Sequence, residues 1–134
     1  MNRRRLLRLG GAALFGGLTG CSAGGRDGRR VAMTDDFDYE PARLTVATGT
    51  TVRWENAGAI AHTVTADGDG IPADADYFAS GGFGSERAAR ADLRGGLIGG
   101  GEGYEHAFGT PGTYDYVCLP HEGSGMTGTV VVQP

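Results

Sequence analysis

Residues 118–126, with the sequence CLPHEGSGM, bring three metal-binding side chains together within one short segment. Cys118 offers a thiolate, His121 an imidazole and Met126 a thioether. Two imidazoles, one thiolate and a weakly bound axial thioether form the ligand set that selects copper for electron transfer. The segment supplies three of these four groups, so one further histidine has to come from elsewhere in the chain.

The missing imidazole has two candidates, because the chain contains three histidines. His62 follows a predicted turn at residues 56–58. His106 alternates with Tyr104 and Phe108 along a predicted strand. Spacing alone excludes neither histidine.

The composition predicts an all-β fold. The 134 residues accommodate one domain with a short N-terminal appendage, and 26 glycines with few helix-forming runs disfavour helices. Seven or eight short strands joined by turns predict a Greek-key β-sandwich of about 100 residues. The expected strands cover residues 31–33, 37–39, 43–46, 51–55, 62–65, 104–108, 113–118 and 127–132.

One short helix is expected in the least regular part of the chain, residues 67–103. Ser85 is suited to cap it, Glu86 suits its first turn, and Gly95 ends it after Arg94. The sequence assigns no role to residues 67–103 as a whole.

The N-terminus has the pattern of an export signal. A basic stretch at residues 3–8 precedes a glycine-rich, weakly apolar stretch at 9–18, and ten such residues are too short to span a bilayer, which needs ~20. Consecutive arginines resemble a twin-arginine signal, and residues 18–21 (LTGC) resemble a lipobox. We therefore expect a lipoprotein signal peptide at 1–20, a lipid on Cys21 and a flexible linker at 21–30. The alternative is conventional cleavage that leaves a free thiol.

The two cysteines fit this division of the chain. A disulfide between Cys21 and Cys118 is conceivable in an exported protein, but it would consume the only thiolate of the 118–126 segment. We therefore assign Cys21 to lipid and Cys118 to metal. The protein is then expected to be exported and held by its lipid at the outer face of the cell membrane.

The charge distribution argues against nucleic acid or an anionic membrane surface as a partner. All twelve basic residues are arginines, and four of them precede Cys21, whereas all sixteen acidic residues follow it. Without its first twenty residues the chain carries eight arginines and sixteen acidic residues, a formal net charge of −8. Such a charge repels polyanions and is compatible with a salt-rich medium.

A family resemblance combines these observations. The pattern Cys118-x-Pro-His121-x₄-Met126-x-Gly, followed by a valine-rich strand, resembles the C-terminal signature of small blue copper proteins, the plastocyanin and amicyanin group of cupredoxins. Residues 55–58 (ENAG) before His62 resemble the first-ligand region of that family. The export signal, the lipobox and the acidic balance make the chain most similar to the halocyanins, the haloarchaeal members.

This resemblance implies a cupredoxin β-sandwich over residues 31–134 with one copper ion as cofactor. By position in the family pattern, His62 and His121 would be the imidazole ligands, Cys118 the thiolate ligand and Met126 the axial ligand. His106 would then pack or face solvent. Taken singly, each ligand has an ordinary alternative as a surface histidine, a buried thiol, a turn residue or a core methionine, but the four alternatives would have to coincide at family spacing.

The implied function is transfer of one electron between redox proteins that dock near His121, by a monomer that is not an enzyme. Three histidines cannot build the trinuclear cluster of a multicopper oxidase. Storage or delivery of copper by a lipoprotein remains the alternative function. One position departs from the family, because Thr63 stands where plastocyanins usually have asparagine, so a shorter hydroxyl would have to tie the two ligand loops together.

Overall fold

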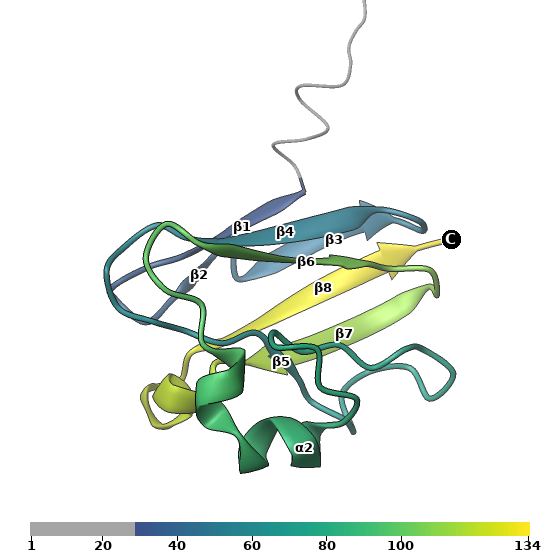
Figure 1. Ribbon diagram of the computed structural model, residues 1–134. Coiled ribbons are helices and arrows are strands. Elements are labelled where there is room, and N and C mark those ends of the chain that lie inside the picture. Colours follow the sequence, from purple (N-terminus) through teal and green to yellow (C-terminus); the bar gives the residue numbers. More distant parts are fainter. Residues whose placement is uncertain (1–28) are drawn as a thin grey trace, which may run out of the picture.

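Two four-stranded sheets pack face to face in the computed structural model, which describes residues 29–134 (Figure 1). The first sheet has the order β2 (Tyr39–Glu40), β1 (Arg30–Met33), β4 (Thr51–Asn56) and β6 (Gly103–Ala107). The second has the order β3 (Arg43–Ala47), β8 (Thr127–Gln133), β7 (Gly112–Val117) and β5 (Thr65–Ala66). The predicted signal peptide, Cys21 and residues 22–28 of the predicted linker lie outside the described residues.

The strand pairing confirms the predicted all-β sandwich with eight strands. β1 runs parallel to β4 and β3 runs parallel to β8, whereas the other neighbouring strands are antiparallel. β7 and β8 share six residue pairs in the centre of the second sheet, so this pair is a firm base for the connection between its strands. That connection is the 118–126 segment.

Period-two alternation places the core side chains between the two sheets. Val52 and Trp54 of β4 are fully buried, as are alternate residues of β8 such as Val130. The Trp54 ring contacts several aromatic rings, whose centroids lie 5.4–6.3 Å away: Phe78, Tyr104, Phe108 and Tyr116. Trp54 therefore occupies the centre of a core built from both sheets.

The one short helix, α2 (Glu86–Ala91), begins where the sequence predicts and ends earlier. The Ser85 hydroxyl accepts a hydrogen bond from the amide of Ala88 at 3.1 Å. Asp92 leaves the helical conformation, and its side chain caps a 3-10 turn, η1 (Leu93–Gly96), by accepting from the amide of Gly95. The predicted extension to Arg94 was therefore wrong. Among residues 29–134, no helix is long and apolar enough to cross a membrane.

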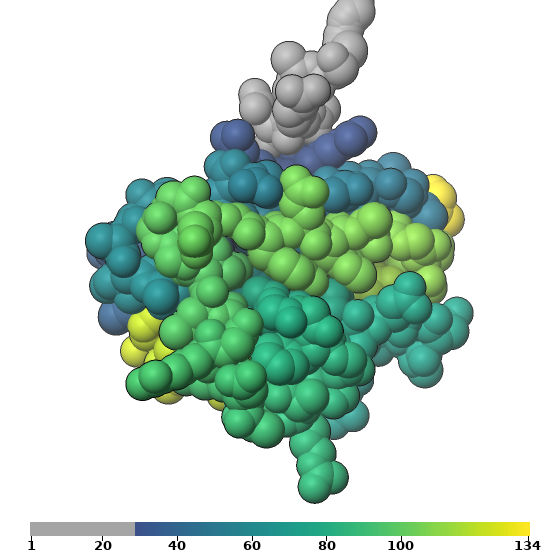
Figure 2. Space-filling model, viewed as in Figure 1, coloured from purple at the N-terminus to yellow at the C-terminus, as the bar shows by residue number. Residues whose placement is uncertain are grey.

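The segment between β5 and β6 covers one side of the sandwich, as its teal and green surface shows in Figure 2. The amide of Ala66 in β5 donates to the carbonyl of Phe78 at 3.1 Å, and the amide of Ser80 donates to the carbonyl of Val64, just before β5, at 2.7 Å. Phe78 is 2% exposed and joins the core. This segment is therefore part of the folded domain.

Two predicted strands are shorter in the structure than in the sequence analysis. Phe37 lies in the turn before β2, and only residues 39–40 pair with β1. In the predicted strand 62–65, the amides of Thr63 and Val64 donate to the side chains of Cys118 and Ser80 instead of to a neighbouring strand. Side chains thus replace the ladder of hydrogen bonds beside the candidate metal site.

Candidate metal centre

The 118–126 segment forms a closed loop at one end of the sandwich. Cys118 follows β7 directly, and a 3-10 segment, η2 (Leu119–Ser124), leads back toward β8. The amide of Cys118 donates to the carbonyl of Met126 at 3.0 Å, which closes the loop at its base. Both side chains are buried, with 0% and 1% of their surface exposed. The thiol and the thioether are therefore held on the inner side of the loop.

His62 is fixed from the opposite side by hydrogen bonds to the end of the 67–103 segment. Its backbone exchanges two hydrogen bonds with Ile98, at 3.2 and 2.7 Å. The Asn56 side chain donates to the carbonyls of Ile60 and Ile98 at 2.7 and 3.0 Å, which fixes the residues before His62. The imidazole that results is fully buried.

The donor atoms of His62, Cys118 and His121 converge on one point. The two Nδ1 atoms are 3.2 Å apart, and the Cys118 Sγ lies 3.7 Å from Nδ1 of His62 and 3.3 Å from Nδ1 of His121. A point equidistant from three atoms so spaced lies about 2 Å from each, which matches metal–nitrogen and metal–thiolate bonds of about 2.0–2.3 Å. The three donors therefore fit one metal ion.

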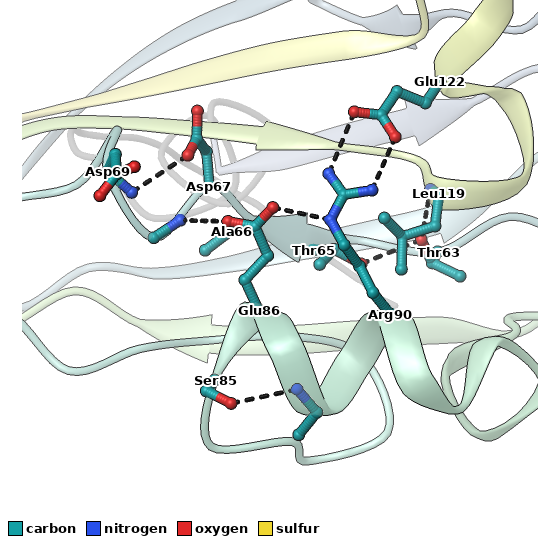
Figure 3. Close-up of polar contacts among 12 residues, drawn as sticks. Thr63, Thr65, Ala66, Asp67, Asp69, Ser85, Glu86, Arg90, Leu119 and Glu122 are labelled. Carbon is teal, nitrogen blue, oxygen red and sulfur yellow. Dashed lines mark hydrogen bonds and ion pairs between the residues drawn. The ribbon is translucent and has the colours of Figure 1, made fainter.

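Thr63 connects the two loops that carry the ligands. Its amide donates to the Cys118 Sγ at 3.4 Å, and its hydroxyl accepts from the amide of Leu119 at 2.9 Å. The hydroxyl also lies 3.1 Å from that of Thr65. Figure 3 draws the contacts of Thr63 with Thr65 and Leu119. The shorter side chain thus does bond across to the second loop, so the departure from asparagine keeps the link.

Burial shifts the pKa of two of these groups. It raises the pKa of the Cys118 thiol, against hydrogen bonds from the backbone of Thr63 and His121 that lower it. Burial and the neighbouring His121 lower the pKa of His62, so its imidazole is favoured in the neutral form. A neutral imidazole has a free lone pair for a metal, and a bound cation would in turn favour the thiolate.

The comparisons with known proteins agree with this geometry. The sequence matches the family model of copper binding proteins of the plastocyanin/azurin family over residues 28–133. The chain belongs to this cupredoxin family. Copper is therefore its cofactor, and a site of two imidazoles, a thiolate and a thioether is typical of type 1 copper.

Curated relatives and solved structures of this cupredoxin include plastocyanins and amicyanin. Plastocyanin of Scenedesmus fuscus is 37% identical over 71% of this chain and 86% of its own length. Chloroplastic plastocyanin of Tetradesmus obliquus is 32% identical over 97% of this chain and 82% of its own length. An oxidized amicyanin variant shares 28% identity with a TM-score of 0.55, over 80% of this chain and 83% of that one.

In this cupredoxin His106 lies away from the converging donors. It pairs with Val52 across β4 and β6, and its ring stacks on Phe78 with centroids 4.7 Å apart. Burial lowers its pKa. The structure therefore brings together His62, Cys118 and His121, with Met126 buried at the base of the same loop, and keeps His106 in the sandwich.

Phe37 is a residue of the site that the sequence analysis missed. Its ring stacks on His121, with centroids 4.4 Å apart and planes 29° from parallel. Its backbone has φ 63°, a left-handed conformation that is uncommon for an aromatic residue. Residues 34–38 (TDDFD) are rich in turn-forming side chains, and this composition could have indicated the turn.

Asp35 of the same turn ties it to the loop before His62. Its carboxylate accepts hydrogen bonds from the amides of Ala59 and Ile60 at 2.9 and 3.0 Å, and these bonds lower its pKa. A Cβ at Gly58 would overlap this carboxylate. The β1–β2 turn therefore contacts both histidine loops, through Asp35 on one side and Phe37 on the other.

Proposed function

We propose that this protein carries one electron at a mononuclear type 1 copper centre and is not an enzyme. The proposed ligands are His62, Cys118, His121 and the axial Met126. The observation that carries the proposal is the convergence of a buried thiol and two imidazoles within 3.2–3.7 Å. Bound copper supplies the redox chemistry, by changing between Cu(I) and Cu(II).

The chain contributes a rigid and nearly dry site. Thr63 ties the two ligand loops together, and His62 and Cys118 have no exposed surface. A site held in this way changes little between the two copper states, so electron transfer needs little rearrangement of the protein. The burial of His62 and Cys118 leaves little of the centre open to a substrate, which supports a carrier over an enzyme.

The proposed route for the electron passes through His121. It is partly exposed, whereas the other three proposed ligands are at most 1% exposed. Two apolar groups beside it reach the surface: the half-buried Phe37 ring, which stacks on it, and the exposed Pro120, its neighbour in sequence. Ile60, at 37% exposure, is hydrogen-bonded to Asp35 of the same turn as Phe37. We propose that redox proteins dock on this apolar face to a monomer of the protein.

An absorption spectrum tests this function. We expect the purified, copper-loaded protein to show a thiolate–Cu(II) charge-transfer band at about 600 nm, which disappears on reduction and returns on oxidation. A lipoprotein that stores or delivers copper is the second candidate, and it would hold colourless Cu(I). Absence of a band in protein that has been shown to contain Cu(II) would contradict the electron-transfer function.

The N-terminal segment supports a proposed place for this function. We propose that residues 1–20 are a twin-arginine lipoprotein signal, that Cys21 carries the lipid, and that residues 31–134 form the copper domain. The domain would then work at the outer face of the cell membrane, between membrane-bound or other extracytoplasmic redox partners. With the acidic balance, this arrangement makes a halocyanin-like protein the most specific proposal.

Cys21→Ser is expected to release the domain from the membrane into the extracellular fraction. A serine cannot accept the thioether-linked lipid. Because stable anchoring needs more than one acyl chain, loss of the lipid from residue 21 should free the domain. Fractionation of cells that express each form, with detection of the domain, measures the effect. Cys118→Ser is the matched control and should stay with the membrane. Wild-type protein that is fully soluble after export would contradict the anchor.

A further inference from the structure

We propose that Arg90 is a positioning residue for His121, because it joins helix α2 to the ligand loop through an ion pair with Glu122. This inference rests on the proposed function of His121 as a ligand. It assigns a role to the 67–103 segment, which supplies Arg90 and lies far from the loop in sequence. We call the set of Glu86, Arg90 and Glu122 the Arg90 network.

The ligand loop needs support from outside, because its middle makes few contacts with the core. None of the residues of η2 is buried. His121 has φ −121° and ψ 19°, which interrupts the helical turn, and Gly125 has φ 81° in the left-handed region. Cys118 and Met126 fix the two ends of the loop. The segment between them is held by single contacts: the Leu119 amide bonds to Thr63, the Phe37 ring stacks on His121, and Glu122 pairs with Arg90.

Arg90 provides such a contact in the geometry that guanidinium groups favour. Its Nη1 and Nη2 atoms donate to the two carboxylate oxygens of Glu122 at 2.8 and 3.0 Å, a bidentate pair (Figure 3). Two parallel hydrogen bonds fix both the distance and the orientation of the carboxylate. Because Glu122 follows His121 directly, this restrains the backbone that carries the imidazole.

The guanidinium is itself held by a second carboxylate. Glu86, one turn earlier on α2, accepts from Arg90 Nε at 2.7 Å. The other oxygen of Glu86 accepts from the amide of Gly68, just after β5, at 2.9 Å. Arg90 therefore reaches Glu122 from a fixed position, and the network connects the end of β5 to the residue beside His121.

The Arg90 network is exposed, so we expect it to affect local opening of the ligand loop and not global stability. The side chains of Arg90 and Glu122 are 42% and 47% exposed. Exposed ion pairs contribute little to global stability, and salt screens them. The network should therefore change local opening of the loop while leaving unfolding of the sandwich almost unchanged.

Hydrogen exchange in the copper-free protein measures this local opening. The amides of Gly125 and Met126 are suitable probes, because they donate within the loop to the carbonyls of Glu122 and His121. Arg90→Gln and Glu122→Gln should each speed exchange at these probes about two- to five-fold, the range of exposed ion pairs. Amides of β7 and β8 should exchange as in the wild type.

The matched control is Arg87→Gln, on the same helix. Arg87 makes no ion pair or hydrogen bond among residues 29–134 for its side chain, so the control removes the same charge without breaking a contact. It should leave exchange at Gly125 and Met126 unchanged. Arg90→Lys, which keeps the charge but cannot form the bidentate pair, should resemble Arg90→Gln.

Two further results decide between positioning and general electrostatics. The double variant Arg90→Gln with Glu122→Gln should exchange no faster than either single variant, and high salt should speed the wild type toward their rates. In the copper-loaded proteins, the paramagnetic resonance spectrum of Cu(II) should differ from wild type in Arg90→Gln and match it in Arg87→Gln.

Unchanged loop exchange in Arg90→Gln, or equal acceleration in Arg87→Gln, would overturn the positioning role. An unaltered Cu(II) spectrum in Arg90→Gln would likewise show that the network does not act on His121. The two claims fail separately. If the copper-loaded protein lacked the blue band, the proposed function would be wrong, but hydrogen exchange in the copper-free protein would still test the role of Arg90.

Discussion

Cys118→Ser is expected to abolish the blue band of the copper-loaded protein and its electron transfer, while the β-sandwich still folds. A serine hydroxyl does not ionise near neutral pH and cannot form the thiolate–copper bond that gives the colour. The substitution is nearly isosteric at a fully buried position, and the amide of Thr63 that donates to Sγ could donate to the new oxygen. Visible absorption and circular dichroism of copper-treated protein measure the two effects.

The copper-free form provides the control for this variant. We expect Cys118→Ser to lower the free energy of unfolding by only about 1 kcal/mol, within the usual range for a single buried substitution. Denaturant unfolding of both copper-free proteins measures that difference. A blue band that persists in folded Cys118→Ser protein would show that the thiolate belongs to another residue, and the proposed site would be wrong.

His62→Ala is expected to remove or grossly change the Cu(II) spectrum, whereas His106→Ala should leave it intact. His62 places Nδ1 within 3.7 Å of both the Cys118 Sγ and the His121 Nδ1, so its loss opens a coordination position. His106 instead stacks on Phe78 and makes an edge contact with Phe108, both at 4.7 Å. Paramagnetic resonance on the two copper-loaded variants measures this difference.

Unfolding of the copper-free His106→Ala variant provides the control for this comparison. His106→Ala removes two aromatic contacts of the sandwich, which should lower the free energy of unfolding by about 1–2 kcal/mol. That loss demonstrates that the variant is altered although its copper spectrum is normal. A changed spectrum in His106→Ala together with a normal one in His62→Ala would exchange the roles of the two residues.

The parts of the fold that follow local rules were predictable from the sequence. Alternation of apolar and polar residues locates β4, β7 and β8, because each buries one face of a sheet. Cys118, His121 and Met126 lie close together in sequence, so one turn of the chain is enough to gather them. His62 comes from a distant loop, and only the resemblance to a family preferred it over His106.

Features that depend on distant contacts could not be predicted in this way. Phe37 alternates with Tyr39 and so suggested a strand, but the turn directs its ring onto His121. The pairing of Arg90 with Glu122 joins residues 32 positions apart, and exposed charges carry no periodic pattern that would indicate a partner. The helix ended early because the Asp92 side chain competes for the backbone, a choice decided by local hydrogen bonds.

The direction of β1 has a consequence for how a tethered domain could turn on a surface. The described chain enters the sandwich at the Arg30 end of this strand, and the turn that contacts both histidine loops follows its Met33 end. Four residues of strand separate the two ends by about 10 Å at ~3.3 Å per residue. In the proposed lipid-anchored protein, the attachment would therefore lie at the end of β1 opposite to the turn that contacts both histidine loops. Rotation of the domain about that attachment would present His121 in turn to the proposed donors and acceptors while the proposed lipid stays in the membrane.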